Sequence, residues 1–285
     1  MAGGPNMRHR HLSRIIGVLV IGMVIAAAFD YLSGAESALS RLEQAGKLYD
    51  QAMCILKESL DDKSLTQALA LLEEAAELDP KSEEVWIQIS WRCWMRGDAL
   101  PKASRQERQK RLGLFEKGMA AGEKALEINP RSVGGMYWYT VNMASGGEMR
   151  GILSSLWMGG TLFGNMGRVD RRDPYYFYGA TRRFGSEVFV RMPSWLTERF
   201  GFKTEYIVED LLDNIQRWPN YFDNYTYLAR IYWWEGNKDK ALDMLEFVLT
   251  QSPEVMPEEK AENARQQVFA REMWKEYTGK EFPQR

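Results

Sequence analysis

Apolar residues beyond residue 36 recur at intervals of three and four positions, the spacing that gathers them on one face of a helix. The sequence lacks the long alternating runs of Val, Ile and Thr and the Asn-Gly turns that are typical of strands and hairpins. The pattern therefore predicts an all-α fold for residues 36–280.

The clearest unit of this pattern spans Phe222–Pro253. Its final proline and Pro219 lie 34 residues apart, and Gly236 falls at the turn between two amphipathic helices. Ala229 and Ala241 stand on the two facing stripes, where small side chains let helices approach closely. The period and the spacing resemble those of a tetratricopeptide repeat.

Partial copies of the repeat precede this unit. Segments that end at Pro80 and Pro130 carry the second-helix pattern, and the intervals from Pro80 through Pro130 and Pro174 to Pro219 all exceed 34 residues. Each boundary therefore carries an insertion, and the sequence predicts an irregular tetratricopeptide-like helical-repeat solenoid with inserted helices. The charged insertion Arg96–Arg111 predicts a solvated loop or a helix extension, with a binding role as the alternative.

The run Gly151–Gly167, "GILSSLWMGGTLFGNMG", carries no charged side chain. It falls where the second helix of a repeat belongs, and it is too short to span a bilayer. An uncharged surface all round indicates burial, and glycine in a helix allows close contact with a neighbouring helix or a ligand. We expect an interior or broken helix, which either only packs in the core or also lines a ligand cavity; a segment that dips into a membrane is the third alternative.

The N-terminal segment has the features of an export signal or a membrane anchor. Arg8, Arg10 and Arg14 precede the apolar run Ile15–Phe29. This run has the length of a signal-peptide core or of a short anchor, and basic flanks stay in the cytoplasm. We therefore divide the chain into a segment 1–35 and a solenoid 36–280, and expect a periplasmic or otherwise extracytoplasmic protein. Residues 15–29 would tether it to the inner membrane unless cleavage near Ala35 releases it. The alternatives are a cytosolic protein held at the membrane by its N-terminal tail and an organellar protein.

Composition excludes several classes of function. The 37 basic and 39 acidic residues give a net charge of −2, which provides no field for nucleic acid. Cys54 and Cys93 lack the spacing of a metal or redox site, and His9 and His11 lie in the N-terminal segment. Phosphate-binding loops and nucleophile elbows are absent. We therefore expect a protein that is not an enzyme, with no catalytic residue, no metal and no cofactor.

Candidate binding residues follow from the repeat register, because the first helix of each repeat lines the concave face of a solenoid. Trp91, Trp94, Arg230 and Trp233 fall on that face, where indole rings hold an apolar ligand or a peptide. The alternative is that the tryptophans only pack beneath inserted helices.

An arginine-rich stretch follows the uncharged run. Within it, Arg182 and Arg183 could capture a carboxylate at the mouth of an apolar pocket. The alternative is surface ion pairing with Asp170, Asp173 and Glu187.

A narrower resemblance begins at Val133. The segments "VGGMYWYTVNMASGGEMRGILSSLW", "DPYYFYGATRRFG" and "MPSWLTERFGFKTEYIVEDLLDNIQRWPNYFDNYTYLARIYWWEGNKDKALDMLEFVL" are similar to the T component of tetratricopeptide-associated TRAP transporters. They also resemble the related domain of the mitochondrial regulators of microtubule dynamics. The resemblance implies a periplasmic protein that partners a solute-binding subunit and self-associates into a small ring. The chain departs from the family because no lipid-bearing cysteine follows the apolar run.

These observations lead to two functional hypotheses. The first is a non-catalytic exported binding protein, accessory to a TRAP-type solute transporter, which binds a partner subunit and a small apolar or carboxylate ligand in a channel lined by Tyr137, Trp138 and Trp157. The second is a cell-envelope scaffold whose concave groove holds a peptide segment of another protein.

Overall fold

The computed structural model describes residues 36, 38–101, 103–150, 152–192 and 203–283, with side chains from 158 onward in the helix that begins at Ile152. Within these ranges the regular elements are helices, and no strand is found. The all-α prediction is confirmed for the described part of the chain.

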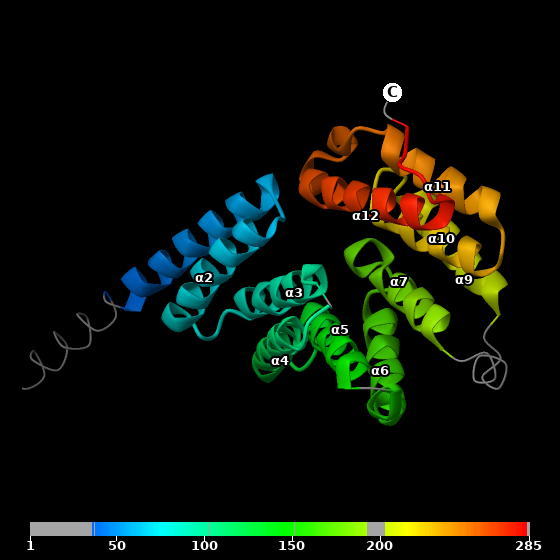
Figure 1. The fold of residues 1–285 in the computed structure, drawn as a ribbon. Coiled ribbons are helices and arrows are strands. Elements are labelled where there is room, and N and C mark those ends of the chain that lie inside the picture. Colours follow the sequence, from blue (N-terminus) through cyan, green and yellow to red (C-terminus); the bar gives the residue numbers. More distant parts are fainter. Residues whose placement is uncertain (1–35, 37, 102, 151, 193–202, 284–285) are drawn as a thin grey trace, which may run out of the picture.

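The helices follow one another in antiparallel pairs (Figure 1). A helix over residues 38–58 packs on α2, α3 on α4, α5 on α6, α7 on α9, and α10 on α11, and α12 follows at the C-terminal end. The bounds are α2 Asp62–Leu78, α3 Glu83–Ala99, α4 Arg105–Ile128, α5 Val133–Arg150, α6 Ile152–Arg172, α7 Tyr176–Arg191, α9 Thr204–Arg217, α10 Phe222–Trp234, α11 Lys238–Thr250, the 3₁₀ turns η1 Pro253–Val255 and η2 Pro257–Glu259, and α12 Lys260–Thr278.

The prolines mark the boundaries between pairs, as the repeat pattern predicts. Asp79 and Asn129 end α2 and α4 with backbone N–H groups that donate to the carbonyls of Ala75 and Ala125, and a proline follows each directly. Proline lacks the N–H that would continue the helix and disfavours helical geometry in the residue before it. Each second helix therefore stops where the next pair begins.

Small side chains let the paired helices pack closely. Ala229 on α10 and Ala241 on α11 are fully buried, which agrees with their expected place on facing stripes. Between α4 and α5 the approach is closer still, since a Cβ atom on Gly118 would lie 2.3 Å from Oδ1 of Asn142. Asn142 in turn donates to the carbonyls of Trp138 and Ser90, at 2.8 and 3.0 Å, and so ties α5 to α3.

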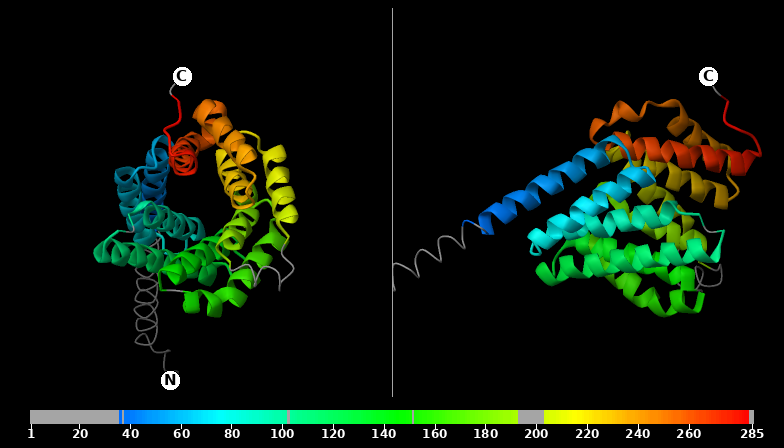
Figure 2. Two further views of the ribbon diagram at one scale, coloured as in Figure 1. Left: turned by 45° about the vertical axis from the view of Figure 1, so that its right-hand side comes forward. Right: turned by 60° about the vertical axis from the view of Figure 1, so that its left-hand side comes forward.

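The pairs wind around a common axis, and the last helix returns to the first ones (Figure 2). The C-terminal end of helix 38–58 lies beside η2 and the start of α12 (Figures 1 and 2), where Glu58 raises the pKa of Lys260 in addition to the nearer Glu254. In the same region the hydroxyl of Tyr178 on α7 donates to Oε1 of Glu259 in η2, with 3.0 Å between the two oxygens. The first helices of the pairs therefore surround a common interior.

The uncharged run corrects one expectation. It forms most of α6, the second helix of its pair, as the repeat register predicts. From residue 158 onward, where its side chains are described, it is not buried on most sides: Leu162, Asn165 and Met166 are buried, whereas Gly160 and Gly164 are exposed. A Cβ atom at Gly159, Gly160 or Gly164 would meet nothing within 4 Å, so these glycines mediate no close approach among the described atoms.

The expected signal or anchor segment, residues 1–35, lies outside the described residues. Across the helices that the structure does describe, none has both the length and the apolar character needed to cross a membrane. The insertion Arg96–Arg111 contains the end of α3 and the start of α4, where Ser104 and Glu107 form a reciprocal capping box. It extends two helices, as one of its alternatives predicts, but Arg111 is buried rather than solvated, with 4% exposure.

Candidate functional site

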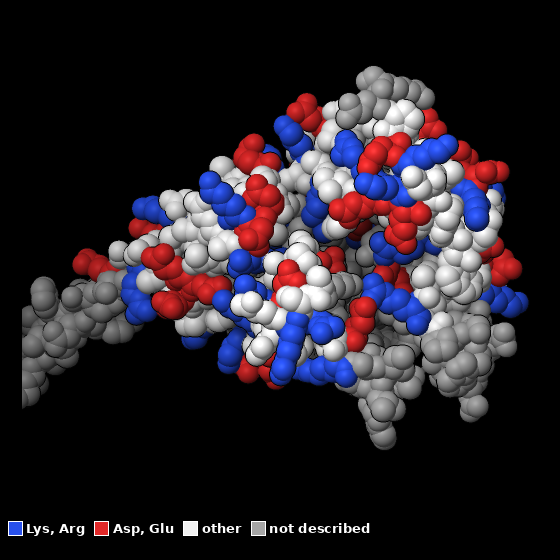
Figure 3. Space-filling view, viewed as in Figure 1, with Lys and Arg blue, Asp and Glu red and all other residues white. Residues whose placement is uncertain are grey.

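A large cavity occupies the interior of the solenoid. Its volume is about 1060 Å³, and its lining comes from the first helices α3, α5, α7 and α10, from α12, and from parts of α4 and α6. This volume is at the upper end of the range typical for ligand pockets. On the face shown in Figure 3, acidic and basic side chains alternate around a central depression.

One wall of the cavity is aromatic. The rings of Trp91 on α3 and Trp138 on α5 stack with centroids 5.0 Å apart, and Trp94 lies 5.6 Å from Trp138. Phe177 on α7 meets Trp91 edge to face at 4.6 Å, and Tyr137 meets Trp138 at 4.8 Å. Edge and stacked contacts of this kind stabilise aromatic groups beyond their area burial, so the wall is held in one arrangement.

Phe177 reaches this wall through an unusual turn at the start of α7. Phe177, Tyr178 and Gly179 have φ values of 45°, 57° and 80°, three successive left-handed residues of which two are aromatic. Side chains larger than hydrogen strain this conformation by about 1–2 kcal/mol each. The strain must be offset by the surrounding contacts.

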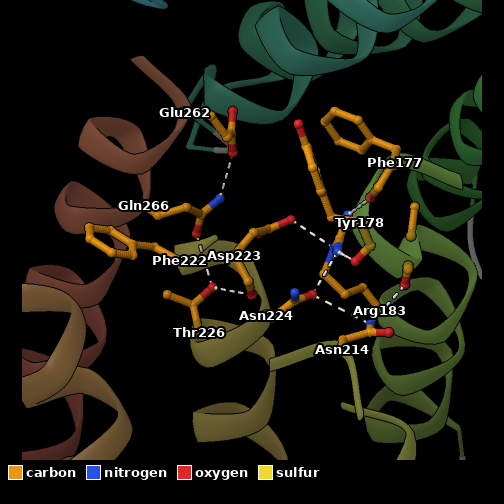
Figure 4. Close-up of polar contacts among 12 residues, drawn as sticks. Phe177, Tyr178, Arg183, Asn214, Phe222, Asp223, Asn224, Thr226, Glu262 and Gln266 are labelled. Atoms are coloured by element: carbon orange, nitrogen blue, oxygen red, sulfur yellow. Dashed lines mark hydrogen bonds and ion pairs between the residues drawn. The ribbon is translucent and has the colours of Figure 1, made fainter. Parts of the chain in front are cut away.

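Arg183 supplies those contacts (Figure 4). Its guanidinium donates to the carbonyls of Phe177 and Tyr178, both at 2.6 Å, and to Oδ1 of Asn224 at 2.7 Å. Asn214 on α9 donates to the carbonyl of Gly179 at 3.1 Å. The turn is therefore fixed from α7, α9 and α10 together.

The same guanidinium forms a buried ion pair with Asp223 on α10, with 2.9 Å between Nε and Oδ2. Burial raises the pKa of Asp223, and the charge of Arg183 offsets part of that rise. Arg183 is 3% exposed and Asp223 8%. A buried charge is tolerated only when it is paired and hydrogen-bonded, and both conditions hold here.

A chain of polar contacts continues from α10 to α12 (Figure 4). The hydroxyl of Thr226 lies 2.9 Å from Oε1 of Gln266, whose amide donates to Glu262 at 2.8 Å. Glu262 pairs with Arg265 at 2.6 Å. Burial raises the pKa of Glu262, but the charge of Arg265 and the hydrogen bonds from Arg265 and Gln266 lower the pKa by more. The wall formed by α10 and α12 is therefore polar, charged and internally paired.

Arginine-carboxylate pairs also line the cavity between α5, α7 and α10. Glu187 pairs with Arg191 and Arg230, and Arg191 also pairs with Glu148. These arginines lower the pKa of Glu187 although its burial acts in the opposite direction. The lining thus combines an aromatic surface with carboxylates that are paired with arginines.

No protein-family model matches this chain, and no curated protein matches its sequence. Solved structures match its fold. TTC0263, a thermophilic tetratricopeptide-repeat protein of Thermus thermophilus, aligns over 81% of this chain and 99% of its own length, with 16% identity and a TM-score of 0.51. The fold is of the tetratricopeptide-repeat type. Weaker matches are YrrB, described as a tetratricopeptide-repeat protein with an unusual peptide-binding site (79% and 91% covered, 14% identity, TM-score 0.37), and MamA (84% and 100% covered, 12% identity, TM-score 0.34).

The tetratricopeptide-like register brings most of the predicted binding residues to the cavity. The lining contains six of them: Trp91, Trp94, Tyr137, Trp138, Arg183 and Arg230. Three of these come from first helices whose concave positions the sequence predicts, namely Trp91, Trp94 and Arg230. That these residues line one cavity does not test whether they bind a ligand, so their binding role stays a prediction.

Three predicted residues do not reach the cavity or cannot be placed. Arg182 turns outward to α9, where it pairs with Asp213. Trp233 stacks on Tyr277 of α12, with ring centroids 3.9 Å apart, because the last helix covers its position. Trp157 belongs to α6, but its side chain lies outside the described residues.

Sequence reasoning missed several lining residues. Arg108 and Arg111 lie in the insertion expected to be solvated, Phe177 depends on the left-handed turn, and α12 contributes Arg265, Gln266 and Phe269. The signal for α12 was present, since a helix after Pro253 occupies the place of the next first helix. Nothing in the sequence spacing signals the left-handed turn.

Candidate metal ligands do not cluster in the described ranges. No group of three or more His, Cys, Asp or Glu side chains there could hold a metal ion. Four acidic lining residues, Glu148, Glu187, Asp223 and Glu262, are held by arginines. The arrangement suits recognition by area and charge.

Proposed function

We propose that this protein is a non-catalytic binding protein that holds a ligand in its central cavity and docks on a partner subunit. The observation that carries the proposal is the cavity of about 1060 Å³ with its wall of Trp91, Trp94 and Trp138. Aromatic walls bind apolar groups through buried area and stacking, and a few fixed polar groups then set orientation.

The cavity is preorganised for such a role. The aromatic rings contact one another, and Arg183 fixes Phe177 through its backbone carbonyls. A ligand that enters a preformed site loses less affinity to the ordering of protein side chains. The preferred occupant is a small apolar molecule or one that also carries a carboxylate.

We further propose an accessory role in a TRAP-type solute transporter. The support is the resemblance of the sequence from Val133 onward to the T component of tetratricopeptide-associated TRAP transporters. Tyr137 and Trp138, which lie in the resembling segment of this chain, line its cavity. The basic and apolar segment up to Phe29 supports export, with a tether at residues 15–29 or release near Ala35. In this role the partner is a periplasmic solute-binding subunit.

A second candidate, an envelope scaffold for a peptide segment, is favoured by the polar wall. Thr226 and Gln266 line the same cavity as the tryptophans, and a peptide backbone there would exchange hydrogen bonds with their hydroxyl and amide groups in place of the bonds they make to each other and to Glu262. Both candidates place the bound molecule in the same cavity.

Native mass spectrometry of the purified full-length chain distinguishes the candidates. The transporter role predicts a co-purifying small molecule that is lost in Trp94→Leu and retained in Trp234→Leu, since Trp234 is 44% exposed and lies outside the lining. The scaffold predicts an empty protein that captures a peptide through Trp94. Retention of the same molecule in both variants would rule out the cavity as the site.

Cell fractionation and affinity purification test the transporter role separately. The full-length chain is expected in the envelope fraction, together with a TRAP-type solute-binding protein. A chain that remains in the cytoplasm, or that purifies without any solute-binding subunit, contradicts this part of the proposal.

A further inference from the structure

The charges on the cavity wall are not fully paired. Of the six lining arginines, Arg183, Arg191, Arg230 and Arg265 form ion pairs with carboxylates. Arg108 and Arg111, both on α4, form none within the described residues. Among the acidic lining residues only Asp98 is likewise without an ion pair in the part of the chain that the structure describes. At this end of the cavity two arginines without ion pairs stand against one such carboxylate, Asp98, whose charge also acts on Arg265.

Arg111 is the more unusual of the two because it is only 4% exposed. Its Nη1 donates to the backbone carbonyls of Asp98, at 3.2 Å, and Leu100. Its Nε is buried and has no partner among the described atoms. Arginine stays charged in proteins, so this site holds a buried cation whose hydrogen bonds, among the described residues, go to neutral backbone carbonyls. Such a charge is normally matched by an anion.

Arg108 lies one turn before Arg111 on the same face of α4, the spacing at which helix side chains are neighbours. It is exposed yet belongs to the lining, so it stands where the cavity opens to solvent. Two guanidinium groups at this spacing can hold one anion between them through charge-assisted hydrogen bonds.

Apolar surface continues from this pair into the cavity. Trp94 is one turn before Asp98 on α3, and its indole N–H donates to Ser145 of α5, which also lines the cavity. Beyond Trp94 the wall continues to Trp138 and Trp91. An occupant with an anionic group at Arg108 and Arg111 would therefore lay its apolar body against the tryptophans.

We propose that Arg108 and Arg111 form an anion subsite of the cavity, and that the cavity takes an amphipathic ligand with one anionic group, a carboxylate or a phosphate, on an apolar body. This inference rests on the proposed binding function. It assigns the binding of an anionic group to Arg108 and Arg111 on α4, whereas the sequence pattern predicted that Arg182 and Arg183 would capture a carboxylate. The order along the wall, from the two arginines to Trp94 and Trp138, sets the orientation of the ligand.

Three probes with one apolar body test the subsite: decanoate, decyl phosphate and decanol, titrated below their micelle-forming concentrations into the full-length protein. Binding is followed by calorimetry and by the fluorescence of the lining tryptophans. At least one anion is expected to bind tenfold or more tightly than decanol, and the preferred anion identifies the head group.

Variants of α4 assign the preference to its residues. Arg108→Gln is expected to reduce the preference for the anion at least threefold without changing decanol binding, and Arg111→Gln to reduce it further. Arg105→Gln on the same helix removes an exposed arginine outside the lining and is expected to change neither. Circular dichroism checks that Arg111→Gln is folded, and Arg108→Gln, at an exposed position, tests the subsite independently.

The outcomes separate the two proposals. If decanol binds as tightly as both anions, or if Arg108→Gln keeps the full preference for the anion, the proposed anion subsite is wrong. Binding in the cavity would still stand in that case if Trp94→Leu weakens the binding of decanol. If none of the three probes binds, both the subsite and the proposed binding of apolar ligands are contradicted.

Discussion

Arg183 on α7 and Asp223 on α10 form an ion pair of 2.9 Å in the interior of the protein. The pair joins two helices of successive repeats, and its guanidinium also holds the carbonyls of Phe177 and Tyr178. Removal of one partner from such a pair leaves the other charge buried and uncompensated.

Arg183→Met is therefore expected to lower the free energy of unfolding by about 3–5 kcal/mol. The neighbouring Arg182→Met, whose partner Asp213 has a side chain 34% exposed, should lower it by no more than about 1 kcal/mol. Urea unfolding followed by circular dichroism measures both. Equal effects of the two substitutions would show that Arg183 is not a buried support of the turn.

The left-handed turn predicts a second difference in stability, between the alanine variants of two glycines that have positive φ. Gly179 has φ 80°, and a Cβ atom there would lie 2.1 Å from Oδ1 of Asn214. Gly236 has φ 82° and nothing within 4 Å of the same position. Gly236→Ala should destabilise the protein by about 1–2 kcal/mol through backbone strain alone. Gly179→Ala should exceed this clearly, because Asn214 must also move and lose its hydrogen bond to the carbonyl of Gly179.

Thermal denaturation of the two alanine variants measures this difference. A Gly179→Ala protein as stable as Gly236→Ala would mean that Asn214 does not pack against the turn as described.

The glycines of α6 allow a test of the corrected expectation about the uncharged run. Gly164 is exposed, helical and free of neighbours, so Gly164→Ala should stabilise the protein by about 0.5–1 kcal/mol. A Cβ atom at Gly118 on α4 would lie 2.3 Å from Oδ1 of Asn142, so Gly118→Ala should destabilise the protein by more than Gly164→Ala stabilises it. Chemical denaturation decides between this account and the original expectation, in which the glycines of the uncharged run make close contacts and Gly164→Ala would be harmful.

An effect of pH on stability is expected where Tyr178 of α7 contacts Glu259 of η2. Burial, with the nearby Glu262 and Glu258, raises the pKa of Glu259 to about 7, although the Tyr178 hydroxyl and Arg92 oppose the shift. Because this pKa is above its unfolded value of 4.5, the folded state binds the extra proton, and stability from this group falls as the pH rises from about 4.5 to 7.

Glu259→Gln should remove this dependence and stabilise the protein at pH 8 by on the order of 1 kcal/mol after allowance for solvent screening. Unfolding free energies of both proteins at pH 5 and pH 8 provide the test. Glu272→Gln, at an exposed position of α12 that does not act on Glu259, is the control. A difference between wild type and Glu259→Gln that does not grow with pH would contradict the assignment.

The sequence predicted those features that depend on short-range rules. The prolines at 80, 130 and 219 stop helices through their own backbone chemistry, so the repeat boundaries could be read without tertiary information. The repeat register then placed Trp91, Trp94 and Arg230 on the inner face.

Features that depend on distant parts of the chain escaped prediction. Trp233 occupies an inner position in its repeat, but Tyr277 of α12 stacks on it. The left-handed turn at Phe177 exists because Arg183, six residues later on the same helix, donates to the Phe177 carbonyl, while Asn214 on α9 holds Gly179 and Asn224 on α10 holds Arg183. The glycines of α6 looked like contact points from composition alone, yet the close contacts occur at Gly118 on α4.

The central claim, that the cavity holds a ligand or a partner segment, is tested most directly by photo-crosslinking in living cells. A photoreactive phenylalanine analogue replaces Trp94 on the cavity wall or, as the control, Trp234 outside it. Mass spectrometry of the irradiated protein should find an added molecule, small or peptide, on the chain modified at position 94 and not on the one modified at position 234. An unmodified mass at position 94, or the same adducts at both positions, would contradict the account.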